Sequence, residues 1–98
     1  MVKWRFHWDK DNKTILIMEL QLIDGAFSPT ETIDILTQLF HVKIKFHEEK
    51  VRNSYNEEDI KMRERKIKLL QKNLDEARAY IKKENKDFHV ESVINILN

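Results

Sequence analysis

The chain begins with a strict alternation of apolar and polar residues. One side of an extended segment over residues 2–8 carries the apolar residues Val2, Trp4, Phe6 and Trp8. The other side carries the polar residues Lys3, Arg5 and His7. A period of two predicts a half-buried strand. Alternation resumes over residues 14–23 after a polar loop, so we expect a β-hairpin over residues 1–24 that ends where Asp24 and Gly25 turn the chain.

The next segment starts with the residues of a helix N-terminus. Ser28 is a capping residue, Pro29 suits the first helical position, and Glu31 completes a capping box. Apolar residues then recur with helical spacing at Ile33, Leu36, Phe40 and Ile44. Residues 42–47 also alternate as a strand does, which leaves a third strand open as an alternative. We favour one continuous helix over residues 28–53, because no turn-forming residue precedes that stretch.

The strongest pattern is a seven-residue repeat in the second half of the chain. A seam of apolar residues at heptad positions a and d consists of Ile60, Ile67, Leu70, Leu74, Ala77 and Ile81. Arg63 occupies one d position, so the seam begins imperfectly. This spacing is typical of a coiled coil and predicts a long helix over residues 56–84. We expect the six seam residues to form a partner interface.

The last segment has the pattern of a short amphipathic helix over residues 87–97. Asp87 can cap its N-terminus. One helical face would carry the apolar residues Val90, Val93, Ile94 and Leu97. Because this tail ends in apolar residues, we expect it to dock through that face.

Together these elements predict an α+β fold in a single domain over residues 1–98. The expected order is an N-terminal β-hairpin, a long antiparallel helical hairpin and a short C-terminal helix. Two strands give too little sheet for so much apolar surface, and an isolated hairpin is only marginally stable. We therefore expect the aromatic side of residues 2–8 to be core. We also expect a homodimer, formed through the hairpin edge or the heptad seam, with binding of another protein as a further option.

The composition indicates the cellular compartment and the class of partner that we expect. The net charge is +1, so no overall field attracts the chain to nucleic acid or anionic lipid. The lack of cysteine excludes disulfides, thiolate nucleophiles and cysteine metal sites. Apolar runs are shorter than the ~18 residues of a membrane span, and residues 1–13 are too polar for a signal peptide. These features predict a cytoplasmic protein that does not insert into a membrane.

Catalytic and metal-binding motifs find no match in the sequence. His47 and Glu48 begin a stretch that resembles the HExxH zinc motif, but Val51 stands where the second histidine would lie. His47 is therefore interpreted as part of a solvated helix surface. The carboxylates fall in turns, caps and charged helix faces, and no serine has the setting of an activated nucleophile. We predict no enzyme activity, no metal site and no cofactor.

Basic residues provide the main alternative function. The run over residues 61–72 contains the candidate nucleic-acid contacts Arg63, Arg65, Lys66 and Lys68. The basic row of residues 3–7 could also face a nucleic-acid groove, and the aromatic row could stack on bases. Helical geometry spreads the run around the helix, and basic residues on an edge strand discourage unwanted pairing, so solvated and protective roles are favoured. The predicted function is a small non-enzymatic intracellular interaction or regulatory module, with a nucleic-acid-binding regulator as the alternative.

Overall fold

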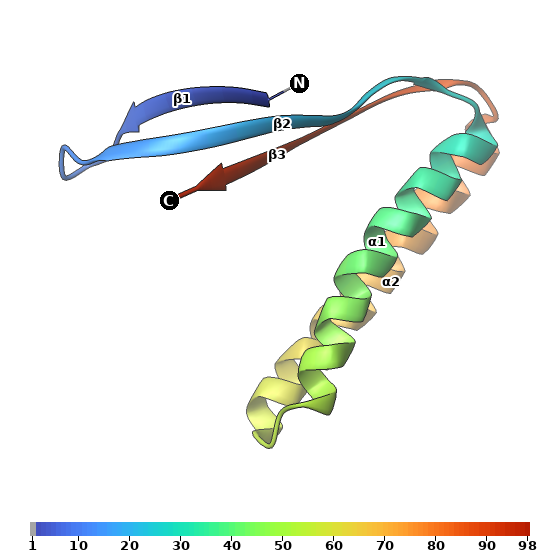
Figure 1. The fold of residues 1–98 in the computed structure, drawn as a ribbon. Helices are drawn as coiled ribbons and strands as arrows, with labels where there is room; N and C mark the ends of the chain where they lie inside the picture. The colour runs from blue at the N-terminus through green and yellow to red at the C-terminus, as the bar shows by residue number, and fades with distance from the viewer. Residues whose placement is uncertain (1) are drawn as a thin grey trace. The chain divides into compact units, whose positions relative to one another are not determined.

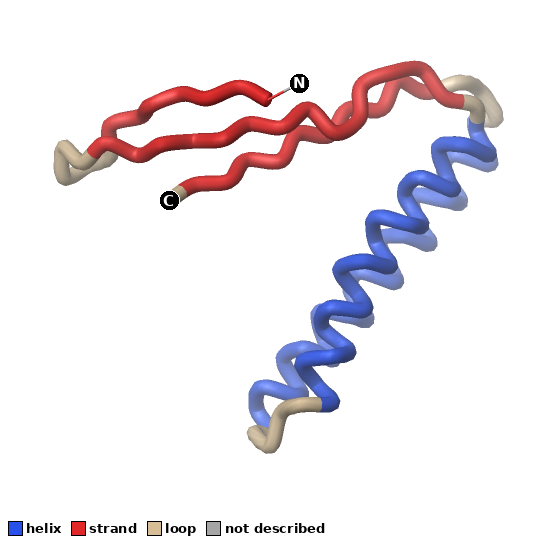
Figure 2. Tube along the Cα trace, in the orientation of Figure 1, coloured by secondary structure: helices blue, strands red, loops and turns tan. Residues whose placement is uncertain are grey.

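A computed structural model describes residues 2–98, which form three strands and two helices. Their order is β1 (Val2–Trp8), β2 (Thr14–Phe27), α1 (Pro29–Arg52), α2 (Glu57–Glu84) and β3 (Phe88–Leu97), as Figures 1 and 2 show. The chain divides into two compact units. The sheet unit contains the residues up to Ala26 together with His89–Asn98, and the helical unit is Phe27–Phe88. The single domain over residues 1–98 stays a prediction.

The sheet unit is one antiparallel sheet in the order β1-β2-β3. Strands β1 and β2 form the predicted hairpin, in which Trp4 pairs with Met18 and Phe6 with Leu16. The connecting turn is stabilised by the Asp9 carboxylate, which accepts hydrogen bonds from the backbone N–H groups of residues 11 and 13 at 2.9 and 2.8 Å. A short acceptor side chain at this position therefore fixes the turn, and with it the register of the hairpin.

The predicted architecture is wrong at the C-terminus, because residues 88–97 form β3 and not a short helix. The apolar residues of this segment fit both the spacing of a helix and the spacing of a strand. Four of its residues, however, are β-branched and favour extended backbone: Val90, Val93, Ile94 and Ile96. Strand β2 offers a second edge, and side chains join the two strands there. The Gln21 amide donates to the backbone oxygen of Ser92 at 3.4 Å, and the Asn98 amide oxygen accepts from the backbone of Leu16 at 3.1 Å.

The expected turn at Asp24 and Gly25 is also wrong, because β2 continues through both residues to Phe27. No glycine in the described residues has a positive φ angle, so Gly25 lies in ordinary strand geometry. The longer β2 brings Asp24 alongside β3, where its side chain lies 2.8 Å from His89.

Helix α1 begins as the capping box predicts. The Ser28 hydroxyl accepts from the backbone of Glu31 at 3.1 Å, and the Glu31 carboxylate accepts from the backbone of Ser28 at 2.9 Å. These hydrogen bonds lower the pKa of the Glu31 carboxyl below its usual value. The helix then runs without a break to Arg52, which confirms the helical interpretation of residues 42–47.

Helix α2 is also delimited by local chemistry. The Asn56 side chain caps it by accepting from the backbone of Asp59 at 3.1 Å, and Asn85 ends it in the left-handed region at φ 46°. Helices α1 and α2 are joined by a short loop and pack side by side as an antiparallel hairpin (Figure 1). Their apolar core is narrow. The buried hydrophobic side chains of this core are Ile44, Leu74 and Ile81.

Leu74 provides a direct test of this core, because it is only 2% exposed. Replacing it with alanine removes three carbons and leaves a cavity, so we expect Leu74→Ala to lower the free energy of unfolding by about 2–5 kcal/mol. Leu69 lies on the same helix but is 58% exposed. Leu69→Ala should change stability by less than about 0.5 kcal/mol. Urea unfolding followed by circular dichroism measures both, and equal effects would contradict the described packing.

Candidate functional site

One face of the sheet unit is apolar and carries both tryptophans of the chain. Strand alternation places Val2, Trp4, Phe6 and Trp8 on the same side of β1. The register sets β2 residues beside them, and we call the combined surface the aromatic face: Val2, Trp4, Phe6, Trp8, Leu16, Met18 and Leu20. None of these seven side chains carries a charge, so the face is both continuous and neutral.

The aromatic side chains of this face are open to water in the described residues. Trp4 is 62% exposed, Phe6 72% and Trp8 67%. The prediction that these residues form a core is therefore wrong for the described structure. The reason is that the sheet unit is a single layer of three strands, with no helix of its own to cover a face. Large apolar patches that stay open to water commonly mark contact sites.

The same face continues across the sheet to β3. The side chains of Asp24 in β2 and of His89 and Glu91 in β3 contact one another, so they lie on one side of the sheet. Because side chains two positions apart on a strand point to the same side, Leu22 lies on the same side of β2 as Asp24, and Leu20 lies there too. Alternation along β3 places Val93 there also. Leu22 and Val93 are 52% and 47% exposed, so the open apolar surface extends across all three strands.

The opposite face differs in chemistry. It carries the basic residues Lys3, Arg5 and His7 of β1. Ile17 of β2, which pairs with Arg5, lies on the same face and is only 6% exposed. Arg5 forms an ion pair with Glu19 on the neighbouring strand, with a nitrogen–oxygen distance of 3.5 Å. Strand β1 is an edge of the sheet, as predicted. The basic residues therefore accompany an unpaired strand edge, which fits a protective role.

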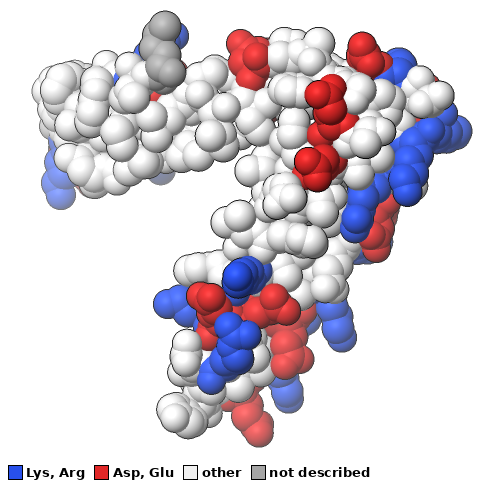
Figure 3. Space-filling model, turned by 45° about the vertical axis from the view of Figure 1, so that its right-hand side comes forward, with Lys and Arg blue, Asp and Glu red and all other residues white. Residues whose placement is uncertain are grey.

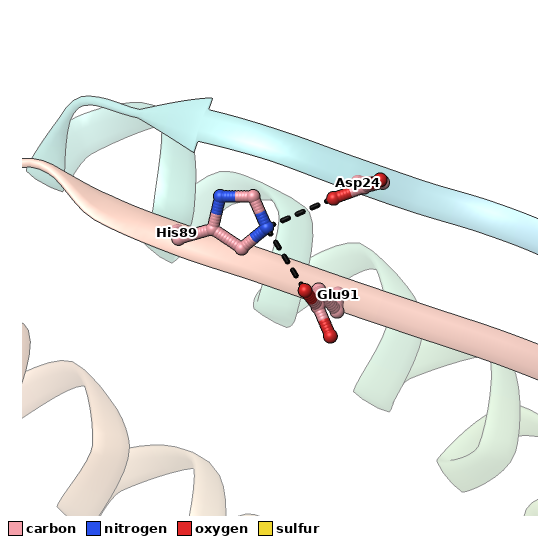
Figure 4. A group of neighbouring side chains, drawn as sticks. All are labelled: Asp24, His89 and Glu91. Atoms are coloured by element: carbon pink, nitrogen blue, oxygen red, sulfur yellow. Dashed lines mark hydrogen bonds and ion pairs between the residues drawn. The ribbon is translucent and has the colours of Figure 1, made fainter.

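A second candidate site lies where β2 and β3 run side by side. The Nε2 atom of His89 is 2.8 Å from Oδ1 of Asp24 and 3.1 Å from Oε1 of Glu91 (Figure 4). The three ligand-type atoms lie within 4.8 Å of one another, and all three residues are exposed. Sequence analysis missed this group because Asp24 and His89 are 65 positions apart. Only the alternation of His89 and Glu91 along a strand could have signalled it.

The helical unit holds a buried histidine that was expected at the surface. His47 is only 5% exposed. Its Nδ1 atom lies 3.1 Å from the Arg63 guanidinium, whose Nε donates to Asp59 at 3.4 Å. Since arginine can only donate, Nδ1 accepts and the ring proton is on Nε2, which has no partner in the described residues. Burial lowers the pKa of His47, and the nearby charges of Arg63, Lys66 and Lys43 lower it further.

The predicted partner interface lies within the helical hairpin. Leu74 and Ile81 of the seam are buried. The other four seam residues are half-buried: Ile60, Ile67, Leu70 and Ala77. Helix α1 packs along α2, so the seam already has a neighbour in its own chain. Contact of these residues with a separate partner stays a prediction.

The predicted nucleic-acid contacts do not act as one group. Arg63 is tied to Asp59 and its side chain is only 20% exposed. Arg65, Lys66 and Lys68 are exposed, and Glu64 adds an acidic side chain beside them. Figure 3 shows charges of both signs over the helices and a largely uncharged sheet on the side in view. Nucleic-acid binding stays a prediction, and mixed charge weakens the attraction that it needs.

Comparisons with known proteins give no relative from which a role could be transferred. No family model, no curated protein and no solved structure matches this chain. Within residues 2–98, neither helix contains an apolar stretch long enough to cross a membrane.

His47 predicts how stability changes with pH. The unfolded chain takes up a proton on this residue near pH 6.5, whereas the folded chain resists protonation because its pKa is lowered. Folding is thus unaffected by this group above pH 6.5 and loses stability as the pH falls below it. We expect His47→Leu to reduce that loss in urea titrations between pH 7 and 5. His41→Leu, at an exposed position of the same helix, is the control. An unchanged slope for His47→Leu would contradict the buried neutral state.

Proposed function

We propose that this chain is a small non-enzymatic interaction module that forms a homodimer by packing its aromatic face against that of a second copy. The observation that carries the proposal is the exposure of Trp4, Phe6 and Trp8, each more than 60% open to water. Aromatic side chains of this size contribute strongly to interfaces when they are buried. A sheet with such a face requires a second layer, and a second sheet is one common solution.

Charge favours a second copy over other partners. A two-fold symmetric contact sets the same patch against itself, so any charge on the patch meets its like. The aromatic face is neutral and meets itself without repulsion. Pairing of two β1 edges would instead bring Lys3 and Arg5 near their copies, which is unfavourable. A polyanion such as nucleic acid finds no cation on the aromatic face. These features support face-to-face self-association.

The remaining parts of the proposal rest on the sequence. A cytoplasmic location is inferred from the lack of cysteine in a small domain. A regulatory or scaffolding role follows from the proposed self-association, because the dimer would present two helical hairpins. The non-enzymatic assignment follows from the sequence motifs, none of which has the spacing of a catalytic group.

Sedimentation velocity at micromolar concentration tests the proposed dimer with two matched variants. Phe6 on β1 and Val42 on α1 are almost equally exposed, at 72% and 71%. Phe6→Glu places a charge in the proposed interface, where burial without a partner is costly, so we expect the dissociation constant to rise at least tenfold. Val42→Glu places the same charge outside the interface and should leave the dimer intact.

Two outcomes would overturn this assignment. A wild-type protein that sediments as a monomer throughout the micromolar range has no such dimer. A dimer that survives Phe6→Glu but dissociates in Val42→Glu uses the helices as its interface. Circular dichroism spectra equal to that of the wild type confirm that each variant is folded.

A further inference from the structure

The Asp24–His89–Glu91 group shares one nitrogen between two carboxylates. In Figure 4 the imidazole of His89 points its Nε2 atom toward both acidic side chains, which approach from β2 and β3. An imidazole nitrogen carries at most one N–H, so it can fully satisfy only one carboxylate oxygen. Two negative charges therefore converge on a single proton. We propose that Asp24, His89 and Glu91 bind a zinc ion.

The distances are close to those that zinc requires. Ligand atoms at about 2.0–2.1 Å from a tetrahedral zinc ion lie about 3.3 Å apart. The His89 nitrogen is 2.8 and 3.1 Å from its two partners, and all three atoms lie within 4.8 Å. The His89 nitrogen is already near this spacing from both carboxylate oxygens, and the two oxygens, which lie within 4.8 Å of each other, must approach to about 3.3 Å when the ion binds. The ion also balances both carboxylate charges, which one proton cannot do.

The ligand types select the class of metal. An imidazole nitrogen with two carboxylate oxygens suits zinc and similar transition metals, whereas Mg²⁺ and Ca²⁺ prefer oxygen ligands alone. Three protein ligands leave the fourth position to water. The side chains are 55–69% exposed, so an ion reaches them from solvent without opening the fold.

The position of the group indicates what the ion does. Asp24 lies near the end of β2, and His89 and Glu91 lie at the start of β3. Metal bonds across these strands would fasten β3 to the rest of the sheet. Alternation along β3 sets residues 89 and 91 on one side of the sheet, and Asp24 of β2 faces the same side. Zinc binding at this point does not depend on the proposed dimer.

Isothermal titration of the full chain with Zn²⁺ tests the site. We expect one equivalent to bind in the wild type. His89→Gln, Asp24→Asn and Glu91→Gln keep the size and hydrogen-bonding capacity of each side chain but remove a ligand or its charge, so each should weaken binding at least tenfold. His41→Gln removes an exposed histidine elsewhere and should bind as the wild type does. Mg²⁺ should give no binding at the same concentration.

Nuclear magnetic resonance of the wild type provides a second readout that needs no variant. One equivalent of Zn²⁺ should shift the imidazole signals of His89 and leave those of His7 unchanged. The proposal is overturned if Zn²⁺ shifts another histidine instead, or if the wild type binds no more tightly than His89→Gln. Because these results do not depend on the oligomeric state, a monomeric protein with an intact zinc site would refute the proposed dimer and leave this inference standing.

Discussion

The exposure of an apolar sheet face is the constraint on which this structure depends. Strands β1, β2 and β3 satisfy one another's backbone groups, but a single layer cannot enclose the side chains of its two faces. Ile17 is nearly buried on one face, whereas Trp4 and Phe6 stay open on the other. Water in contact with the open face is unfavourable by roughly 25 cal/mol per Å² of apolar area. A molecule that covered the aromatic face would therefore stabilise the sheet unit.

The helical unit is stabilised in a different way from the sheet unit. Its two long helices are set by caps at both ends, and the core between them is narrow. A buried His47 replaces an apolar residue in that core and is held by Arg63, which is in turn held by Asp59. These contacts join the two helices through His47 and Arg63. Because burial lowers the pKa of His47, we expect the hairpin to lose stability in acid.

The sequence predicted the helices better than the sheet, for physical reasons. Capping residues such as Ser28 and Asn56 form hydrogen bonds to groups only a few positions away, so they can be recognised from the local sequence. The segment over residues 88–97 fits both a helix and a strand, and the edge of β2 decides between them. The apolar alternation of residues 2–8 predicts core positions, but alternation gives no information on what covers a face. Asp24 and His89 come together only through the pairing of β3 with β2, which no local pattern reveals.

Tryptophan fluorescence measures the central claim most directly, because Trp4 and Trp8 are the only tryptophans and both lie on the aromatic face. A dilution series from micromolar to nanomolar protein reports whether these rings are buried against a second copy. The account predicts blue-shifted emission, protected from iodide quenching, that moves to the red as the dimer dissociates. Emission typical of water-exposed indole at every concentration would contradict it. So would blue-shifted emission that does not depend on concentration in a chain that sediments as a monomer.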